Sequence, residues 1–463
     1  MNTKKTLSRR RFLERLAVTA VGSGAIATQG KLGLMQSALA ATGDYSNLTD
    51  YKSLVCVFLF GGNDSFNTIV PTNDGPYAQY QNLRGAMALP QNSLLGLNGS
   101  NYGFHPTMGG LQNMYNTGKL AVVGNVGTLF EPTDRESYQN GTALLPPDLF
   151  SHNDQQEIWQ TARAPLSGIT QPGWGGRMAD LLGEANSNPY VPPTITMAGN
   201  NNFQAGVNAL PFSMNAFSGV EEFRFLSNSG WPPWEASRSE TWSEILSAPY
   251  NHALERQAAE GLATAKLQIA ELNDTLDQAP AIVTEYPEDS YIAAQLRMVA
   301  RVISIREQLG MKRQIFFVGF GSFDFHGSQL NEQAAKLQEL SGAMSAFQAN
   351  MDELSLGDTV TAFTSSDFGR TLSVNGDGTD HGWGNAAMVM GGAVNGGAIY
   401  GSPPSLDIGG PQDTDNAGRM IPEYSLGQYG ATLARWMGIE DSDLGDIFPY
   451  LNNFGSTDIG FMG

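Results

Sequence analysis

Four glycine-rich stretches of the sequence carry aspartate or histidine side chains that can bind a metal ion. They read GGNDSFN, GSFDFHGS, TSSDFGRT and GDGTDHGWGN, and their candidate ligands are Asp64, Asp324, His326, Asp367 and His381. Carboxylate oxygen combined with imidazole nitrogen suits Zn²⁺ or Mn²⁺ better than Mg²⁺ or Ca²⁺. Any one stretch is equally compatible with a turn or a helix cap, where aspartate is common. Together they predict a site for one or two divalent metal ions.

The elements next to these stretches are what must bring the side chains together. Asp64, Asp324 with His326, and Asp367 each follow an apolar run that is typical of a buried strand, whereas His381 precedes one; the four runs span 53–64, 314–321, 358–366 and 386–394. Ligands of α/β proteins collect at the carboxyl ends of parallel strands. We therefore expect these side chains to meet at one edge of a sheet.

Buried strands alternate with helical segments along the chain, which indicates an α/β fold. Residues 106–127 are predicted to form a helix followed by a buried strand, a further strand is predicted at 192–199, and helices are predicted at 151–164, 251–278, 290–310, 331–355 and 425–438. This alternation favours a doubly wound, mostly parallel sheet with helices on both faces. We expect residues 41–463 to form a single domain of this kind, with a loop-rich, irregular insertion at about 200–250.

Residues 1–40 have the features of an export signal and are left out of the fold. They contain Arg9, Arg10 and Arg11, then a modest apolar stretch, then Ala38-Leu39-Ala40. The arginine cluster resembles a twin-arginine signal, and a general secretory signal is the alternative. We expect a periplasmic or secreted protein whose partner during export is the twin-arginine translocase, with no membrane span in the mature chain.

The charge of the chain excludes some partners. The formal net charge is −19, and because residues 1–40 carry seven basic residues and one acidic residue, the rest of the chain has −25. Such a surface repels nucleic acid, so no nucleic-acid partner is expected. The single cysteine, Cys56, lies in the apolar run LVCVFLF and is expected to be a buried apolar residue.

Several blocks of the sequence resemble a known family. FLFGGNDSFNTIVP, SHNDQQEIWQ, GFGSFDFHGSQ, FTSSDFGRTLSVNGDGTDHGWGN and YGATLARWMG, followed by FPYL, resemble blocks of the domain-of-unknown-function 1501 proteins, over roughly residues 50–455. That family is distantly similar to the alkaline phosphatase and sulfatase superfamily. The resemblance implies an alkaline phosphatase-like fold and metal-dependent hydrolysis of phosphate or sulfate esters.

The superfamily's metal ligands can be carried over residue by residue. Asp64 matches the Asp after the first strand, and Asp324 and His326 match an Asp and a His after a later strand, although at tighter spacing. Asp367 matches the Asp of a following Asp-His pair, but Phe368 stands where the His is expected. His381 matches a final His. The departure at Phe368 puts a complete two-metal site in doubt, and Asp380 is a candidate replacement ligand.

The resemblance also implies a nucleophile at the start of a helix. Ser151 fits this position, where the helix dipole and a metal ion would both favour the alkoxide. The alternative is that Ser151 only caps the helix by accepting a backbone N–H bond. His152 and Arg370 are candidates for substrate binding, because the guanidinium fork suits phosphate or sulfate oxygens; Arg370 could equally pair with a carboxylate.

Two functions are therefore compatible with the sequence. The first is an exported metal-dependent hydrolase acting on a small-molecule or glycan ester of phosphate or sulfate. The second is a non-catalytic binding or assembly protein of the cell envelope, which keeps the fold with a degenerate metal site. Phe368 is the residue that favours the second.

Overall fold

The computed structural model of the chain describes residues 43–188, 191–220 and 234–463. The predicted export signal at 1–40 lies outside the described residues. The described residues form two compact units, one with residues 43–220 and 274–463, apart from the gap at 189–190, and the other with residues 234–273. The candidate site residues all belong to the larger unit.

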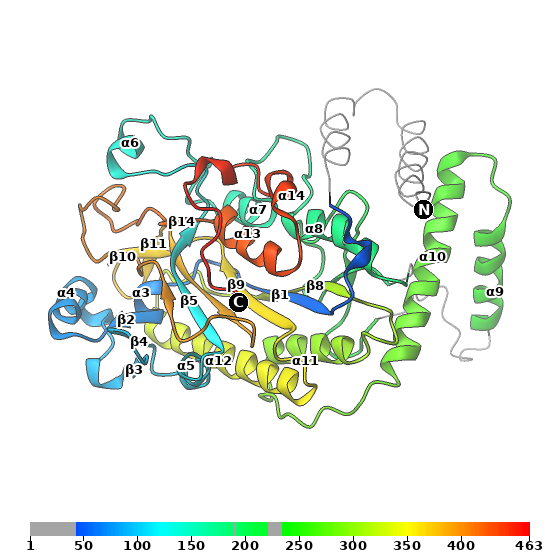
Figure 1. The fold of residues 1–463 in the computed structure, drawn as a ribbon, viewed down its shortest axis with the longest axis horizontal. Coiled ribbons are helices and arrows are strands. Elements are labelled where there is room, and N and C mark those ends of the chain that lie inside the picture. Colours follow the sequence, from blue (N-terminus) through cyan, green and yellow to red (C-terminus); the bar gives the residue numbers. More distant parts are fainter. Residues whose placement is uncertain (1–42, 189–190, 221–233) are drawn as a thin grey trace. The chain divides into compact units, whose positions relative to one another are not determined.

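A nine-stranded sheet forms the centre of the larger unit, counted over the described residues (Figure 1). Its order is β13-β5-β12-β9-β1-β8-β6-β7, with β14 also paired to β5. The strands are β1 (Lys52–Leu59), β5 (Leu120–Gly127), β6 (Thr194–Thr196), β7 (Phe212–Ser213), β8 (Arg313–Phe320), β9 (Val360–Ser366), β12 (Asn385–Met390), β13 (Ile399–Tyr400) and β14 (Tyr424–Ser425). β1 pairs in parallel with β8 and β9, which confirms the predicted mostly parallel sheet.

The strand β12 runs against its neighbours, and this direction matters for the site. It pairs antiparallel with both β9 and β5. The amino end of β12 therefore lies at the same edge of the sheet as the carboxyl ends of β1, β8 and β9. A residue that precedes β12, such as His381, can for that reason reach residues that follow the parallel strands.

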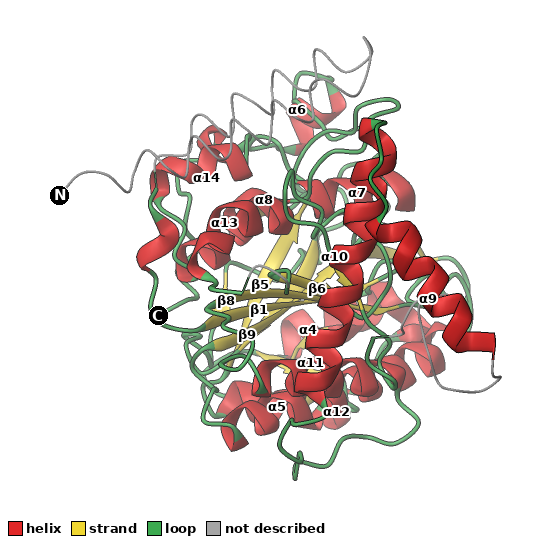
Figure 2. Cartoon of the chain, turned by 90° about the vertical axis from the view of Figure 1, so that its right-hand side faces the viewer, coloured by secondary structure: helices red, strands yellow, loops and turns green. Residues whose placement is uncertain are grey.

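Helices cover both faces of this sheet (Figure 2). One face carries α7 (His152–Thr161), α8 (Trp174–Leu182), α13 (Leu426–Trp436) and α14 (Asp441–Ile447), and the other carries α5 (Gly109–Asn116), α11 (Tyr291–Ser304) and α12 (Gln329–Glu353). The predicted α/β fold with helices on both faces is confirmed. No helix among the described residues is long and apolar enough to cross a membrane.

The apolar run of β1 explains its central position. Every residue from Ser53 to Leu59 is buried, because alternate side chains pack against the helices of opposite faces. Cys56 belongs to the core cluster that also contains Trp174 of α8 and Tyr429 of α13. The prediction that Cys56 is a buried apolar residue is confirmed.

The smaller unit contains a helix within the segment predicted as irregular. Its described part holds α9 (Trp234–Ser247) and most of α10 (Ala253–Leu276). None of the residues of α9 is buried, so the apolar periodicity that identifies a helix from sequence is missing there. Local contacts support the helix instead: Arg238 pairs with Glu235 at 3.3 Å and lies 5.0 Å from the ring centroid of Trp234.

The buried His105 is expected to make the folded protein less stable in acid. It follows β4 (Tyr102–Phe104), its Nδ1 accepts a hydrogen bond from the backbone N–H of Thr107 at 3.2 Å, and burial lowers its pKa to about 4. The unfolded chain takes up this proton below about pH 6.5 while the native protein does not, so stability falls as the pH drops. We expect His105→Gln to remove about 2 kcal/mol of the stability loss between pH 8 and pH 5.

Urea unfolding at a series of pH values measures this effect. His252→Gln is the matched control because His252 is exposed, and the stability of this variant should depend on pH as that of wild type does. An unchanged pH slope in His105→Gln would contradict the assignment.

Candidate metal centre

Three histidines and one aspartate meet at the carboxyl edge of the sheet, and we call them the His–Asp cluster: His152, Asp324, His326 and His381. Asp324 and His326 lie in the loop that follows β8, and His152 is the first residue of α7. His381 ends β11 (Thr379–His381), which pairs antiparallel with β10 (Arg370–Val374). The edge predicted from the sequence therefore does collect side chains of the kinds that can bind a metal ion.

The carboxylate of Asp324 is the centre of the cluster. Its Oδ1 lies 2.9 Å from His326 Nε2 and 3.2 Å from His381 Nε2, and its Oδ2 lies 3.4 Å from His152 Nε2. The Nε2 atoms of His326 and His381 are 3.1 Å apart. One ligand atom each from His152, Asp324 and His381 all lie within 4.8 Å of one another.

The other ring nitrogen of each histidine faces an oxygen outside the cluster. His381 Nδ1 lies 2.7 Å from the backbone carbonyl oxygen of Phe150, and His152 Nδ1 lies 2.7 Å from Asp367 Oδ2. His326 Nδ1 is 3.5 Å from Asp380 Oδ1. An N–H donated from Nδ1 leaves the lone pair on Nε2, and metal-binding histidines are oriented in this way.

These side chains fit a divalent metal ion. His152 Nε2 is buried and has no hydrogen-bond partner among the described residues, although it lies 3.4 Å from Asp324 Oδ2. In a tetrahedral zinc site with bonds of about 2.0–2.2 Å, ligand atoms are roughly 3.3–3.6 Å apart. The separations of 2.9 to 3.4 Å around Asp324 are close to that spacing.

The charges around the cluster set its protonation. Burial would raise the pKa of Asp324, but the hydrogen bond and charge of Arg370 outweigh it, and the pKa is lowered. The hydrogen bond to Asp367 raises the pKa of His152 against the effect of burial, while burial lowers the pKa of His381. A metal ion needs unprotonated imidazole, so protons compete with it chiefly at His152.

Asp367, predicted as a metal ligand, lies behind His152. Its buried Oδ2 accepts hydrogen bonds from Gln156 Nε2 at 2.9 Å and from the backbone N–H of Gly61 at 3.2 Å, in addition to the contact with His152 Nδ1. In this position the carboxylate fixes the orientation of the His152 ring.

This placement gives a prediction for Asp367. We expect Asp367→Asn to weaken metal binding by about 10- to 100-fold, because His152 loses its charged partner but remains in the cluster. Competition with a chelator measures the change. A loss as complete as that of a removed ligand would instead return Asp367 to the ligand set.

Asp64, also predicted as a ligand, is not brought to the cluster. Its fully buried carboxylate forms an ion pair with Arg84, at the end of α4 (Asp74–Arg84). Its Oδ1 also accepts the backbone N–H of Phe66 at 3.0 Å and so caps α3 (Ser65–Thr68). The pair with Arg84 explains the difference, since a buried carboxylate needs a charged partner and Asp64 has one elsewhere.

Arg370 and Phe368 are two buried residues that contact members of the cluster. The Arg370 side chain is fully buried, and its Nη1 donates to Asp324 Oδ1 at 2.6 Å. Arg370 therefore pairs with a carboxylate, which was the alternative to substrate binding that the sequence left open. The buried Phe368 ring lies 4.8 Å from the His152 ring and 4.6 Å from the His381 ring, measured between centroids, so it supplies an apolar surface in place of a ligand.

Ser151 lies between Phe150, whose backbone carbonyl contacts His381, and His152, which belongs to the cluster. It is the N-cap residue of α7, but its side chain accepts no backbone N–H bond. Its Oγ donates to Asp154 Oδ2 at 2.5 Å instead. Ser151 therefore does not cap α7 by accepting a backbone N–H bond. Its hydroxyl instead donates to the carboxylate of Asp154, which can accept a proton.

The sequence did not identify His152 as a candidate ligand. No strand precedes it directly, so the strand-end argument that selected the others does not apply to it. The only signal was its place beside Ser151 in the SHNDQQEIWQ block.

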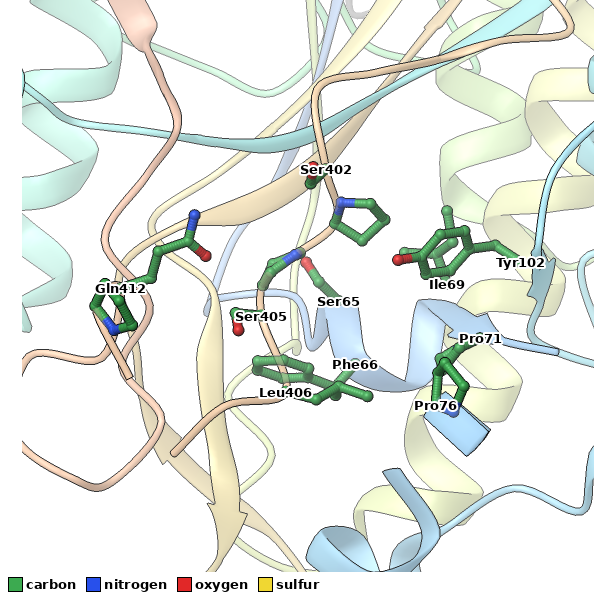
Figure 3. A pocket seen from close by; sticks show the side chains of 13 residues that line it. Ser65, Phe66, Ile69, Pro71, Pro76, Tyr102, Ser402, Ser405, Leu406 and Gln412 are labelled. Carbon is green, nitrogen blue, oxygen red and sulfur yellow. The ribbon is translucent and has the colours of Figure 1, made fainter. Parts of the chain in front are cut away.

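A separate cavity of about 520 Å³ opens beside α3, and Figure 3 shows its lining. The loop that carries Ser402 and Gln412 faces Ser65, Phe66 and Ile69 across it. None of the residues of the His–Asp cluster lines this cavity.

Comparison with known proteins confirms the family resemblance in part of the chain. Residues 235–414 match the family described as "Protein of unknown function (DUF1501)". No curated protein sequence matches the chain.

Several solved structures are loosely similar. The PsFucS1 sulfatase from Pseudoalteromonas sp. is 9% identical, with 90% of this chain and 73% of that chain covered and a TM-score of 0.36. A mutant of the alkaline phosphatase PafA is 10% identical, with 70% and 64% covered and a TM-score of 0.32. The C-terminal periplasmic domain of EcEptC from Escherichia coli, in complex with Zn, is 10% identical, with 76% and 77% covered and a TM-score of 0.33.

Proposed function

We propose that this protein is an exported metal-dependent hydrolase of phosphate or sulfate esters. The observation that carries the proposal is the convergence of His152, Asp324 and His381, whose ligand atoms lie within 4.8 Å of one another. His326 completes the set. Because histidine nitrogens outnumber carboxylate oxygens around the centre, Zn²⁺ is the first candidate and Mn²⁺ the second.

A bound divalent ion would supply positive charge that stabilises the oxygens of the ester as the transition state forms. Ser151 is the proposed nucleophile. Its Oγ attacks phosphorus or sulfur, its proton passes to Asp154 Oδ2 along the existing 2.5 Å hydrogen bond, and the bond to the ester oxygen breaks, with that oxygen taking a proton from water as it leaves as the alcohol. Water then cleaves the covalent ester and restores the Ser151 hydroxyl.

The surroundings of the cluster support this chemistry. Phe368 and Arg370 are both buried and contact members of the cluster, whereas the side chains of Asp324 and His326 are 41% and 47% exposed, so a ligand can reach them from solvent. Asp324 is kept ionised by Arg370, which makes it available as a ligand at neutral pH.

Export and substrate class complete the proposal. The arginine-rich leader supports export by the twin-arginine translocase to the periplasm or beyond. The substrate would be a small-molecule or glycan ester that carries phosphate or sulfate. The strong negative charge of the chain makes the metal ion necessary for attracting such an anion.

A non-catalytic envelope protein is the second candidate, and Phe368 favours it. The ring occupies the place of an expected ligand and contacts both His152 and His381, so a second metal ion has fewer ligands available. A protein of this kind would bind one metal ion and turn over no ester.

The test combines metal analysis with turnover. We expect purified protein to hold about one equivalent of Zn²⁺ or Mn²⁺ and to cleave an aryl phosphate or aryl sulfate, with activity lost in Ser151→Ala. Ser290→Ala is the matched control, since Ser290 caps α11 with an ordinary hydrogen bond to the backbone N–H of Ala293 at 3.2 Å. Protein that neither retains nor takes up a divalent metal would refute the proposal, and metal without turnover would favour the second candidate.

A further inference from the structure

Buried hydrogen bonds extend from the cluster into the protein, beginning at Arg370. Its Nη1 donates to Asp324 Oδ1 at 2.6 Å, and its Nε donates to Thr379 Oγ1 at 3.2 Å. The same guanidinium also donates to the backbone carbonyl oxygens of Gly61, at 3.3 Å, and of Thr379. The guanidinium of Arg370 is thus held by Gly61 and Thr379 while it donates to Asp324.

The chain of hydrogen bonds continues from Thr379 to the buried ion pair. Thr379 Oγ1 donates to Gln329 Oε1 at 2.7 Å. Gln329 Nε2 in turn donates to Asp64 Oδ2, the oxygen that also binds Arg84. We call the three side chains between Asp324 and Asp64, namely Arg370, Thr379 and Gln329, the relay.

The donors and acceptors of the relay run in one consistent direction. Thr379 accepts from Arg370 and donates to Gln329, and a hydroxyl has a single hydrogen to donate. Gln329 must then present its carbonyl oxygen to Thr379 and its amide nitrogen to Asp64. The carboxylate of Asp64 thereby fixes which way the Gln329 amide points.

Burial of these side chains makes the order of donors and acceptors costly to change. Arg370, Thr379 and Gln329 are each at most 1% exposed, and so are Asp64 and Arg84. Water therefore cannot replace a lost partner, and an unpaired polar group in this place is costly. The two ion pairs, Asp324–Arg370 and Asp64–Arg84, also balance their charges along the relay.

We propose that the relay positions the Asp324 carboxylate for metal binding, which makes Arg370, Thr379 and Gln329 positioning residues of the site. This inference rests on the proposed metal-dependent function. It assigns a role to Arg370 other than the substrate contact expected from the sequence, and it links Asp64 to the metal site without making Asp64 a ligand. The Oδ1 atom that Arg370 holds is the same atom that faces His326 and His381.

The test interrupts the relay at two places. Thr379→Val removes the central hydroxyl at nearly constant volume, and Gln329→Met removes the amide that Gln329 contributes from the first turn of α12. We expect each to weaken zinc binding by about 10-fold in competition with a chelator. Because both break the same connection, the double variant should lose about as much as either single variant.

Two controls separate the relay from general damage to the core. Thr379→Ser keeps the hydroxyl and should restore zinc binding to within about 2-fold of wild type. Thr361→Val makes the same change at a buried threonine of β9 whose Oγ1 meets no hydrogen-bond partner in the described part of the chain, and it should leave zinc binding unchanged.

A second readout is independent of metal. In metal-free protein, Thr379→Val and Gln329→Met should shift the side-chain NMR signals of His326 and His381, because Asp324 moves against them, whereas Thr361→Val should not. If wild-type protein binds no zinc but the two variants still show these shifts, the relay is supported and the proposed function is rejected. Normal zinc affinity and unshifted histidine signals in both variants would overturn the relay.

Discussion

Replacing Asp324 by asparagine is expected to raise the dissociation constant for zinc by at least about 100-fold and to abolish metal-dependent turnover. Asp324 is the only residue whose side chain contacts all three histidines of the cluster among the described residues. Asparagine keeps an oxygen that accepts the Arg370 hydrogen bond but loses the negative charge that a divalent ion needs. The fold should therefore survive while the metal site does not.

The control for this variant is chosen by exposure and charge. Asp352→Asn removes a carboxylate whose side chain is 41% exposed, as that of Asp324 is, and which pairs with Lys119 at 2.5 Å. It should bind zinc like wild type. Isothermal titration with zinc, alongside thermal unfolding of metal-free protein, measures both properties. Stoichiometric zinc with wild-type affinity in Asp324→Asn would show that the cluster is not the metal site.

Replacing Asp64 by alanine is expected to lower the free energy of unfolding by about 3–5 kcal/mol. Arg84 is fully buried and would keep a positive charge without its partner. Burial lowers the pKa of Arg84 to about 9, with the charge of Arg370 acting in the same direction, so the guanidinium is charged at neutral pH and would be left without its partner. The N-cap hydrogen bond to the backbone N–H of Phe66 is lost as well.

Urea unfolding of metal-free protein measures this loss. Asp441→Ala is the matched control, because Asp441 pairs with Arg435 at 2.6 Å but is 80% exposed, and it should cost less than about 1 kcal/mol. Combining Asp64→Leu with Arg84→Met removes both charges and should recover most of the stability. If Asp64→Ala is as stable as wild type but cannot bind zinc, Asp64 is a metal ligand after all.

Most of the fold could be predicted because its signals are local. The run LVCVFLF is apolar at every position, and a strand buried on both faces is the structure that accommodates it. The edge of the sheet that holds the site followed from the same reasoning. α9 was missed because it buries no residue and so carries no apolar period.

The site could be located from the sequence but not fully assigned. Asp324, His326 and His381 were identified correctly as members of one cluster, while the metal contact itself remains a proposal. His152 is the ligand candidate that strand-end reasoning could not reach, since it enters the cluster from the start of a helix.

The sequence by itself determined that an α/β sheet would gather carboxylates and imidazoles at one edge. Only the tertiary structure decided how three similar aspartates divide their roles: Asp324 faces the histidines, Asp367 lies behind His152, and Asp64 pairs with a buried arginine. The physical reason is that a buried carboxylate takes its role from the charged partner it meets. Arg84 and Arg370 are supplied by elements whose contact with these strand ends exists only once the chain has folded.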